Sequence, residues 1–160
     1  MSWRSEDDTR VFAGRLAALP GLRRAYIALH GDLGAGKTTL VRHLLRALGV
    51  QGRVKSPTYA VVEPYEIEVP AVAAAPGGML AVWHFDFYRF GDPREWEDAG
   101  FRDIFASPGL KLAEWPEKAA GQLPAADLDL YLAVGDDDAR SVTLRAGTTL
   151  GRGMLRELCP

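Results

Sequence analysis

The stretch HGDLGAGKTTL, residues 30–40, constrains the fold more than any other part of this sequence. Residues 31–38 match the pattern G-x-x-x-x-G-K-[S/T] in full. The glycines allow backbone angles that bulkier residues avoid, and they let main-chain N–H groups face inward around an anion. The apolar run AYIAL at 25–29 precedes the motif, and leucines at helical spacing follow it. This strand–turn–helix context predicts a nucleotide-binding phosphate loop.

Two side chains have specific chemical tasks in such a loop. Lys37 would reach the β- and γ-phosphates of a nucleotide, and the hydroxyl of Thr38 would ligate Mg²⁺. Magnesium prefers oxygen ligands, and in open α/β sheets ligands gather at the carboxyl ends of the strands. Asp86 ends the strand-like run VWHF and Glu114 ends LKLA, so both are candidate members of a metal site. Strand-end acids also occur as surface charges or salt-bridge partners, and the sequence leaves these alternatives open.

The composition is that of a compact protein with one domain. The 160 residues are 48% hydrophobic, which suits a single domain over 1–160 with a buried core. The formal net charge of −2 provides no bulk attraction for nucleic acid. The one cysteine, Cys159, forms neither an internal disulfide nor a metal cluster by itself. No apolar run reaches membrane-spanning length and the acidic N-terminus is unlike a signal peptide, so we expect a cytoplasmic protein without a membrane partner.

Strand-like and helix-like segments alternate over the first two-thirds of the chain. Ser5 and Asp8 have the spacing of a capping box that starts a helix, and Gly49 suits the end of the helix after the phosphate loop. Further strands are expected at 79–90, 109–116, 128–134 and 141–146, and a helix from Asp92-Pro93 that carries Trp96, Ile104 and Phe105. The order predicts an α/β fold, a P-loop NTPase-like three-layer sandwich with a mostly parallel central sheet. The final hairpin, turning at Gly135-Asp136-Asp137-Asp138, would add antiparallel edge strands.

Other parts of the sequence receive a structural interpretation. Residues 53–69 have strand-like composition interrupted by prolines, and 71–79 are typical of a hairpin loop or mobile insertion. His30 and His84 lie in or beside strands and are expected to be packed and hydrogen-bonded rather than catalytic. His43 lies on the helix after the loop, where we expect it to be solvated.

Beyond the phosphate loop, three strings follow in order: SPTYAVVEPY (56–65), HFDFYR (84–89) and LAEWP (112–116). Together with HGDLGAGKTT they closely resemble the bacterial TsaE (YjeE) family, over roughly residues 5–150. The resemblance implies a small P-loop ATPase required for threonylcarbamoyladenosine at position 37 of tRNAs that read codons beginning with A. It further implies ATP or ADP and Mg²⁺ as ligands, TsaB and TsaD as partners, and no more than indirect or transient contact with tRNA.

The resemblance also implies roles for individual residues. The expected nucleotide contacts are Thr9, Asp32, Leu33, Gly34, Ala35, Gly36, Lys37, Thr38, Thr39 and Trp115. The expected catalytic residues are Lys37, Asp86 and Glu114; Thr38 and Glu114 would ligate the metal, with Asp86 as a metal-site or water-positioning acid. The expected switch-like residues are Ser56, Pro57, Thr58 and Tyr59 in one segment and Tyr88 and Arg89 in another. Arg89 is either an internal arginine that stabilises the transition state or an ion-pair partner.

The sequence departs from the family pattern in one long segment, 66–79, which predicts a loop insertion. Phe87 in place of the usual leucine and Ala60 in place of a frequent threonine are smaller departures. Two other functions remain open at this point: a small-molecule kinase on the same fold, and a nucleotide-dependent switch or scaffold with incidental turnover. A GTPase is disfavoured because the chain contains no asparagine and therefore no N-K-x-D string.

Overall fold

The computed structural model describes residues 1–71, 76–135, 137 and 139–159. Its seven-stranded sheet has the order β1-β7-β6-β2-β5-β4-β3. The strands are β1 (Ser2–Trp3), β2 (Tyr26–His30), β3 (Val62–Val69), β4 (Gly78–Asp86), β5 (Leu110–Glu114), β6 (Leu128–Val134) and β7 (Arg140–Ala146). The helices are α1 (Glu6–Ala17), α2 (Lys37–Ala47), α3 (Pro93–Asp98), α4 (Phe101–Ala106) and α5 (Thr149–Leu158), with short 3₁₀ helices η1 (Pro20–Arg24) and η2 (Pro116–Ala119).

The centre of the sheet is parallel and its edges are antiparallel, which confirms the predicted fold class. Strands β6, β2, β5 and β4 run parallel to one another, while β7 and β3 run antiparallel to their inner neighbours. One detail of the prediction is wrong. The final hairpin does not lie wholly at an edge, because its first strand, β6, pairs in parallel with β2.

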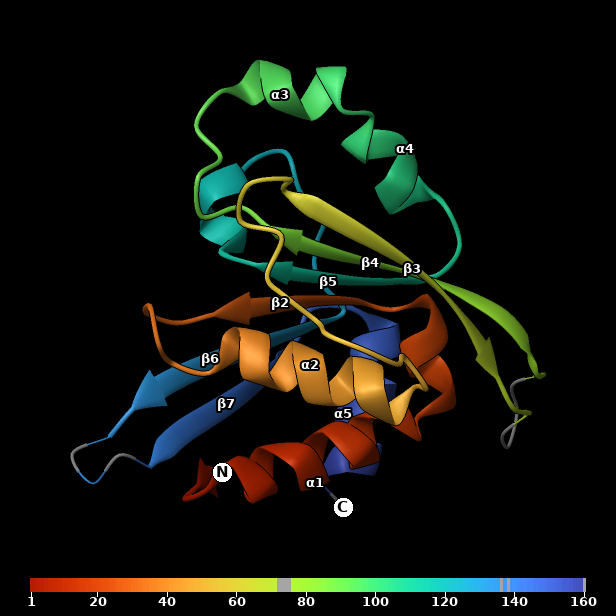
Figure 1. Cartoon of the computed structure of the whole chain (residues 1–160). Coiled ribbons are helices and arrows are strands. Elements are labelled where there is room, and N and C mark those ends of the chain that lie inside the picture. The colour runs from red at the N-terminus through yellow and green to blue at the C-terminus, as the bar shows by residue number, and fades with distance from the viewer. Residues whose placement is uncertain (72–75, 136, 138, 160) are drawn as a thin grey trace.

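Helices cover both faces of the sheet, giving the three layers that the sequence predicted. Side chains alternate between faces along a strand. In β2, Ile27 and Leu29 belong to a core shared with α1, α2 and α5, whereas Tyr26 and Ala28 belong to an aromatic core under α3 and α4. Figure 1 shows α1, α2 and α5 on one side of the sheet and α3 and α4 on the other.

The helix boundaries follow local sequence signals. Ser5 caps α1 and forms the predicted capping box with Asp8. Gly49 follows α2 in a left-handed conformation (φ +111°), and its N–H donates to the Arg46 carbonyl, as expected for a helix-ending glycine. The single helix predicted after Asp92 is instead two short helices, because Gly100 adopts a left-handed conformation (φ +69°) between α3 and α4.

The segment around β3 differs most from the prediction. Pro64 lies inside β3, opposite Trp83 of β4. This is possible because β3 is the sheet's edge strand, where a missing N–H can face away from the ladder. The predicted loop at 66–79 is wrong at both ends, since 66–69 continue β3 and 78–79 begin β4; residues 72–75 lie outside the described residues. Two residues of the predicted second turn, Asp136 and Asp138, also lie outside them.

Within the described residues, no helix has both the length and the apolarity needed to cross a membrane.

Two glycines of α5 provide a matched test of the packing in this fold. A Cβ built on Gly151 would lie 1.7 Å from the carbonyl oxygen of Asp127, whereas a Cβ on Gly153 would meet nothing within 4 Å. We expect Gly151→Ala to lower the free energy of unfolding by about 2–3 kcal/mol through overpacking. We expect Gly153→Ala to raise it by about 0.5–1 kcal/mol, because alanine favours the helix. Urea unfolding of both variants measures the difference; equal effects would contradict the packing of α5 against the start of β6.

Candidate functional site

The loop between β2 and α2 has the backbone geometry of an anion cradle. Gly31, Gly34 and Gly36 adopt φ angles of +135°, +82° and +106°, which side chains rarely allow. Gly31 has a second constraint, since a Cβ there would lie 2.2 Å from the carbonyl oxygen of Leu132. The loop leads directly into the N-terminus of α2, whose main-chain N–H groups and helix dipole favour a bound anion.

Lys37 is held inside this loop. Its side chain is buried, and its Nζ donates to the carbonyl oxygens of Gly31 and, at 2.8 Å, Asp32. The Nζ also lies 4.2 Å from the centroid of the Trp115 ring. Burial lowers the pKa of Lys37 from its usual range, and nearby carboxylates, Glu114 foremost, oppose that shift. An anion bound beside Lys37 would restore the stability of its charged form.

Thr38 and Glu114 meet across the site. The Thr38 hydroxyl donates to both carboxylate oxygens of Glu114, at 3.0 Å to Oε1 and 2.8 Å to Oε2. Neighbouring ligands of an octahedral Mg²⁺ with bonds of 2.0–2.1 Å are about 3 Å apart, so these oxygens suit adjacent positions around that ion. Among the described residues no group of three or more His, Cys, Asp or Glu side chains is arranged to hold a metal. Two protein oxygens supplemented by phosphate and water fit the usual mode of Mg²⁺ binding.

Asp86 lies beside Glu114 because β4 and β5 pair these two residues in register. Its Oδ2 accepts hydrogen bonds from the hydroxyls of Ser56 and, at 3.3 Å, Thr58, and its Oδ1 accepts from the main-chain N–H of Tyr88 at 3.0 Å. Asp86 therefore joins both of the segments that the sequence marked as switch-like.

These groups line one pocket of about 310 Å³. The lining residues are Leu33, Gly34, Gly36, Lys37, Thr38, Thr39, Ser56, Thr58, Asp86, Tyr88, Glu114 and Trp115. Three residues that the sequence placed in the switch-like segments, Pro57, Tyr59 and Arg89, are not part of this lining. The guanidinium of Arg89 instead lies over the exposed ring of Tyr59, 4.5 Å from its centroid. The side chain of Asp32 is exposed and lines neither this pocket nor the one beside it.

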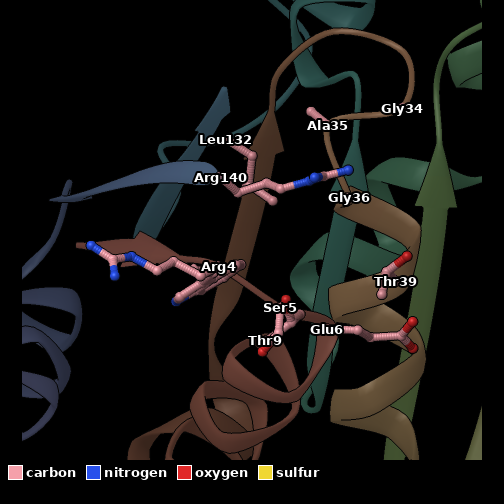
Figure 2. A pocket seen from close by; sticks show the side chains of 11 residues that line it. Arg4, Ser5, Glu6, Thr9, Gly34, Ala35, Gly36, Thr39, Leu132 and Arg140 are labelled. Atoms are coloured by element: carbon pink, nitrogen blue, oxygen red, sulfur yellow. The ribbon is translucent and has the colours of Figure 1, made fainter. Parts of the chain in front are cut away.

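A second pocket of about 200 Å³ shares Gly34, Gly36 and Thr39 with the first and lies on the side of β1, β6 and β7. Thr9 and Ala35, both expected to contact nucleotide, line it. Figure 2 shows Thr9 at the start of α1, Thr39 on α2, and Arg140 reaching from β7 toward Gly36. Six further lining residues were not predicted from the sequence: Trp3, Arg4, Ser5, Glu6, Leu132 and Arg140. Strand pairing between β1 and β7 brings these distant segments together, and no local sequence pattern predicts that pairing.

His84 is the missed residue that lies nearest the acids. It is fully buried, and its Nε2 is 2.8 Å from Oε1 of Glu114. The prediction of a packed, hydrogen-bonded histidine is confirmed, and its partner is a residue of the site. Its position two residues before Asp86, on the same face of β4, was the available signal.

The other two histidines form hydrogen bonds with carboxylates away from these acids. His30 has Nε2 at 2.9 Å from Asp129 and its ring stacked on Tyr131, which agrees with a packed, hydrogen-bonded role. The expectation that His43 is solvated is wrong. Its side chain is buried between α1 and α2, and its Nε2 lies 2.8 Å from Oε1 of Glu6.

Comparison with known protein families agrees with the family resemblance found in the sequence. The family model described as "Threonylcarbamoyl adenosine biosynthesis protein TsaE" matches residues 3–142. The chain is 45% identical to the tRNA threonylcarbamoyladenosine biosynthesis protein TsaE of Haemophilus influenzae over 150 residues, covering 91% of this chain and 85% of the relative. It is 33% identical to the protein of the same name from Bacillus subtilis, with the same two coverages.

A solved structure has the same fold. It is titled "Crystal structure of Bacillus subtilus YdiB" and superposes with a TM-score of 0.73 at 26% sequence identity. The superposition covers 99% of this chain and 93% of the other. The agreement extends over the whole sheet and both helical layers rather than over the phosphate loop alone.

Trp115 lies beside Lys37 in the pocket of about 310 Å³, here called the phosphate pocket. The fluorescence of Trp115 can therefore report the binding of an anion there. An anion that draws Lys37 away from the indole ring should change the emission of Trp115. We expect inorganic triphosphate with Mg²⁺ to alter the tryptophan fluorescence of the unmodified chain, and Trp115→Phe to remove most of that change. Trp96→Phe is the matched control, because Trp96 is buried in the aromatic core under α3 and α4. A signal that survives in Trp115→Phe would contradict binding in this pocket.

Proposed function

The chain belongs to the TsaE family of tRNA threonylcarbamoyladenosine biosynthesis proteins, and we propose that it is a Mg²⁺-dependent ATPase required for that modification. The nucleoside concerned is at position 37 of tRNAs that read codons beginning with A. The observation that carries the proposal is the convergence of Lys37, Thr38 and Glu114 in one pocket at the end of the parallel sheet. This is the arrangement that phosphoryl transfer to water requires, a cation for the phosphates beside an oxygen-lined metal site.

Each group has a defined task in the proposed reaction. Lys37 would exchange its bonds to loop carbonyls for the β- and γ-phosphates and neutralise charge that develops there. Thr38 Oγ1 and Glu114 would hold Mg²⁺, which when bound polarises the phosphate oxygens. Asp86 lines the same pocket and would orient the attacking water. Thr38, Glu114 and Asp86 thus act as positioning and binding groups rather than as nucleophiles.

The second pocket suits the nucleoside end of ATP. It continues from the phosphate pocket across Gly34, Gly36 and Thr39, so a ligand cradled by the loop can occupy both. Thr9 supplies a buried hydroxyl there. We assign the adenine and ribose to this pocket as part of the same proposal.

We further propose that the chain acts in the cytoplasm together with TsaB and TsaD. The family's pathway modifies tRNA. The phosphate pocket contains one positively charged side chain. In the part of the chain that the structure describes, Lys37 is the single lysine or arginine in that lining. Efficient phosphoryl transfer commonly uses a further cation, often supplied by a partner.

Two substitutions separate nucleotide binding from metal-dependent chemistry. We expect Lys37→Ala to weaken ATP binding at least about 100-fold, or ~2.7 kcal/mol, because the buried cation is lost. We expect Glu114→Ala to lower kcat about 100-fold or more through loss of a metal ligand, while metal-free ADP affinity changes by less than about threefold. Calorimetric titration with ADP and ATP, with and without Mg²⁺, measures both. Lys118→Ala removes an exposed positive charge near the site and is the matched control. ATP binding that survives in Lys37→Ala would overturn the proposed site.

Because Lys37 is the single positively charged side chain in the described lining of the phosphate pocket, we predict slow ATP hydrolysis by the isolated chain. We expect ATP turnover to rise at least about tenfold when TsaB and TsaD are both added, because a partner then supplies or positions the missing charge. Phosphate release is measured with the chain alone, with each partner separately and with both. A fast rate that no partner changes would count against this part of the proposal.

A further inference from the structure

His84 is a polar residue in a position where packing alone would favour an apolar one. It lies on β4, and 0% of its surface is exposed. Its Nδ1 is buried and has no hydrogen-bond partner among the described residues. A buried, unsatisfied nitrogen is unfavourable relative to a side chain such as leucine. In this structure the hydrogen bond of the other ring nitrogen, Nε2, compensates for that unfavourable burial.

That other nitrogen, Nε2, lies 2.8 Å from Oε1 of Glu114. A carboxylate oxygen accepts hydrogen bonds, so Nε2 is the donor. Glu114 is itself 2% exposed, and its hydrogen-bond donors in the described structure are His84 and Thr38. Hydrogen bonds to a buried carboxylate are strong, and they fix the rotation of the group.

The two donors differ in what they are attached to. Thr38 is in the first turn of α2 and belongs to the phosphate loop, whereas His84 belongs to β4 of the sheet. Oε1 accepts from both donors, while Oε2 accepts from Thr38 alone. Oε2 therefore has fewer hydrogen-bond donors than Oε1 and keeps an unused acceptor position.

We propose that His84 is a positioning residue for Glu114. Its Nε2–H fixes Oε1, and this directs Oε2 toward the cation position beside Thr38. The inference rests on the proposed function, because it concerns the residue that would ligate Mg²⁺. Hydrogen bonds to a metal-ligating carboxylate tune metal affinity, and their loss commonly weakens binding about 10–100-fold.

The test compares a variant that removes the donor with one that retains it. His84→Leu removes the N–H, while His84→Gln can place an amide N–H near the position of Nε2. Mg²⁺ is titrated into protein saturated with ADP, followed by calorimetry or by the emission of Trp115, and ADP affinity is also measured in excess chelator. We expect His84→Leu to raise the half-saturating Mg²⁺ concentration about 10–100-fold, with metal-free ADP affinity within about threefold of the unmodified chain. We expect His84→Gln to have a half-saturating Mg²⁺ concentration within about threefold of that of the unmodified chain.

His43→Leu is the matched control, because it removes another buried histidine whose Nε2 faces a carboxylate, that of Glu6, outside the phosphate pocket. It should leave the half-saturating Mg²⁺ concentration unchanged. If His84→Leu does not fold, His84→Asn, whose shorter side chain cannot bring its N–H to Glu114, is compared with His84→Gln. Equal Mg²⁺ responses in that pair would overturn the inference.

Two other results would overturn it. In one, His84→Leu has an unchanged response to Mg²⁺; in the other, metal-free ADP affinity falls as far as metal affinity, which indicates a purely structural role. An unmodified chain that binds ADP without any response to Mg²⁺ would overturn the proposed metal-dependent function and this inference together. The behaviour of the unmodified chain thus separates the two failures.

Discussion

The hydrogen bonds from Thr38 to Glu114 join the phosphate loop to the sheet, and the arrangement of the site depends on them. They link residues 76 positions apart, from the first turn of α2 to the last residue of β5. The pairing of β4 with β5 then places Asp86 next to Glu114, which brings two buried carboxylates together. Buried carboxylate oxygens require hydrogen-bond donors in place of the water that they lose. Glu114 has Thr38 and His84, and Asp86 has Ser56, Thr58 and the N–H of Tyr88.

The same acids are bordered by backbone in an unfavourable conformation. Val61, whose carbonyl accepts from the N–H of Asp86, has a φ of +66°, and Trp115, which follows Glu114, has a φ of +56°. For residues other than glycine, and above all for a β-branched valine, this region is strained and is maintained by surrounding contacts. Val61 directly precedes β3 and Trp115 directly follows β5, so each strained residue lies at a junction between a strand and a loop beside the site. The main-chain hydrogen bond from the N–H of Asp86 to the carbonyl of Val61 ties one of these strained residues directly to an acid of the site.

Local sequence patterns predicted which residues meet in the phosphate pocket better than they predicted the residues around it. The phosphate loop, the acids at the ends of β4 and β5 and the parallel sheet follow from short motifs and the alternation of segments. The contact of His84 with Glu114, the pocket lined by Trp3 and Arg140, and the place of Pro64 inside β3 depend on which strands are neighbours and in which register. Register between strands distant in sequence is set by the packing of the whole sheet, so no local pattern specifies it.

The two pockets lie against different parts of the sheet, and we propose that they receive different parts of the ligand. The carboxyl ends of β2, β4 and β5 surround the pocket that we assign to the phosphates, as expected where parallel strands end together. The second pocket is walled by β1, β6 and β7, and β1 is held there by antiparallel pairing with β7. The loop residues Gly34, Gly36 and Thr39 belong to both pockets and lie between these two parts of the sheet. A parallel sheet without the C-terminal hairpin would therefore retain the groups that act on phosphate and lose the wall that we assign to the nucleoside.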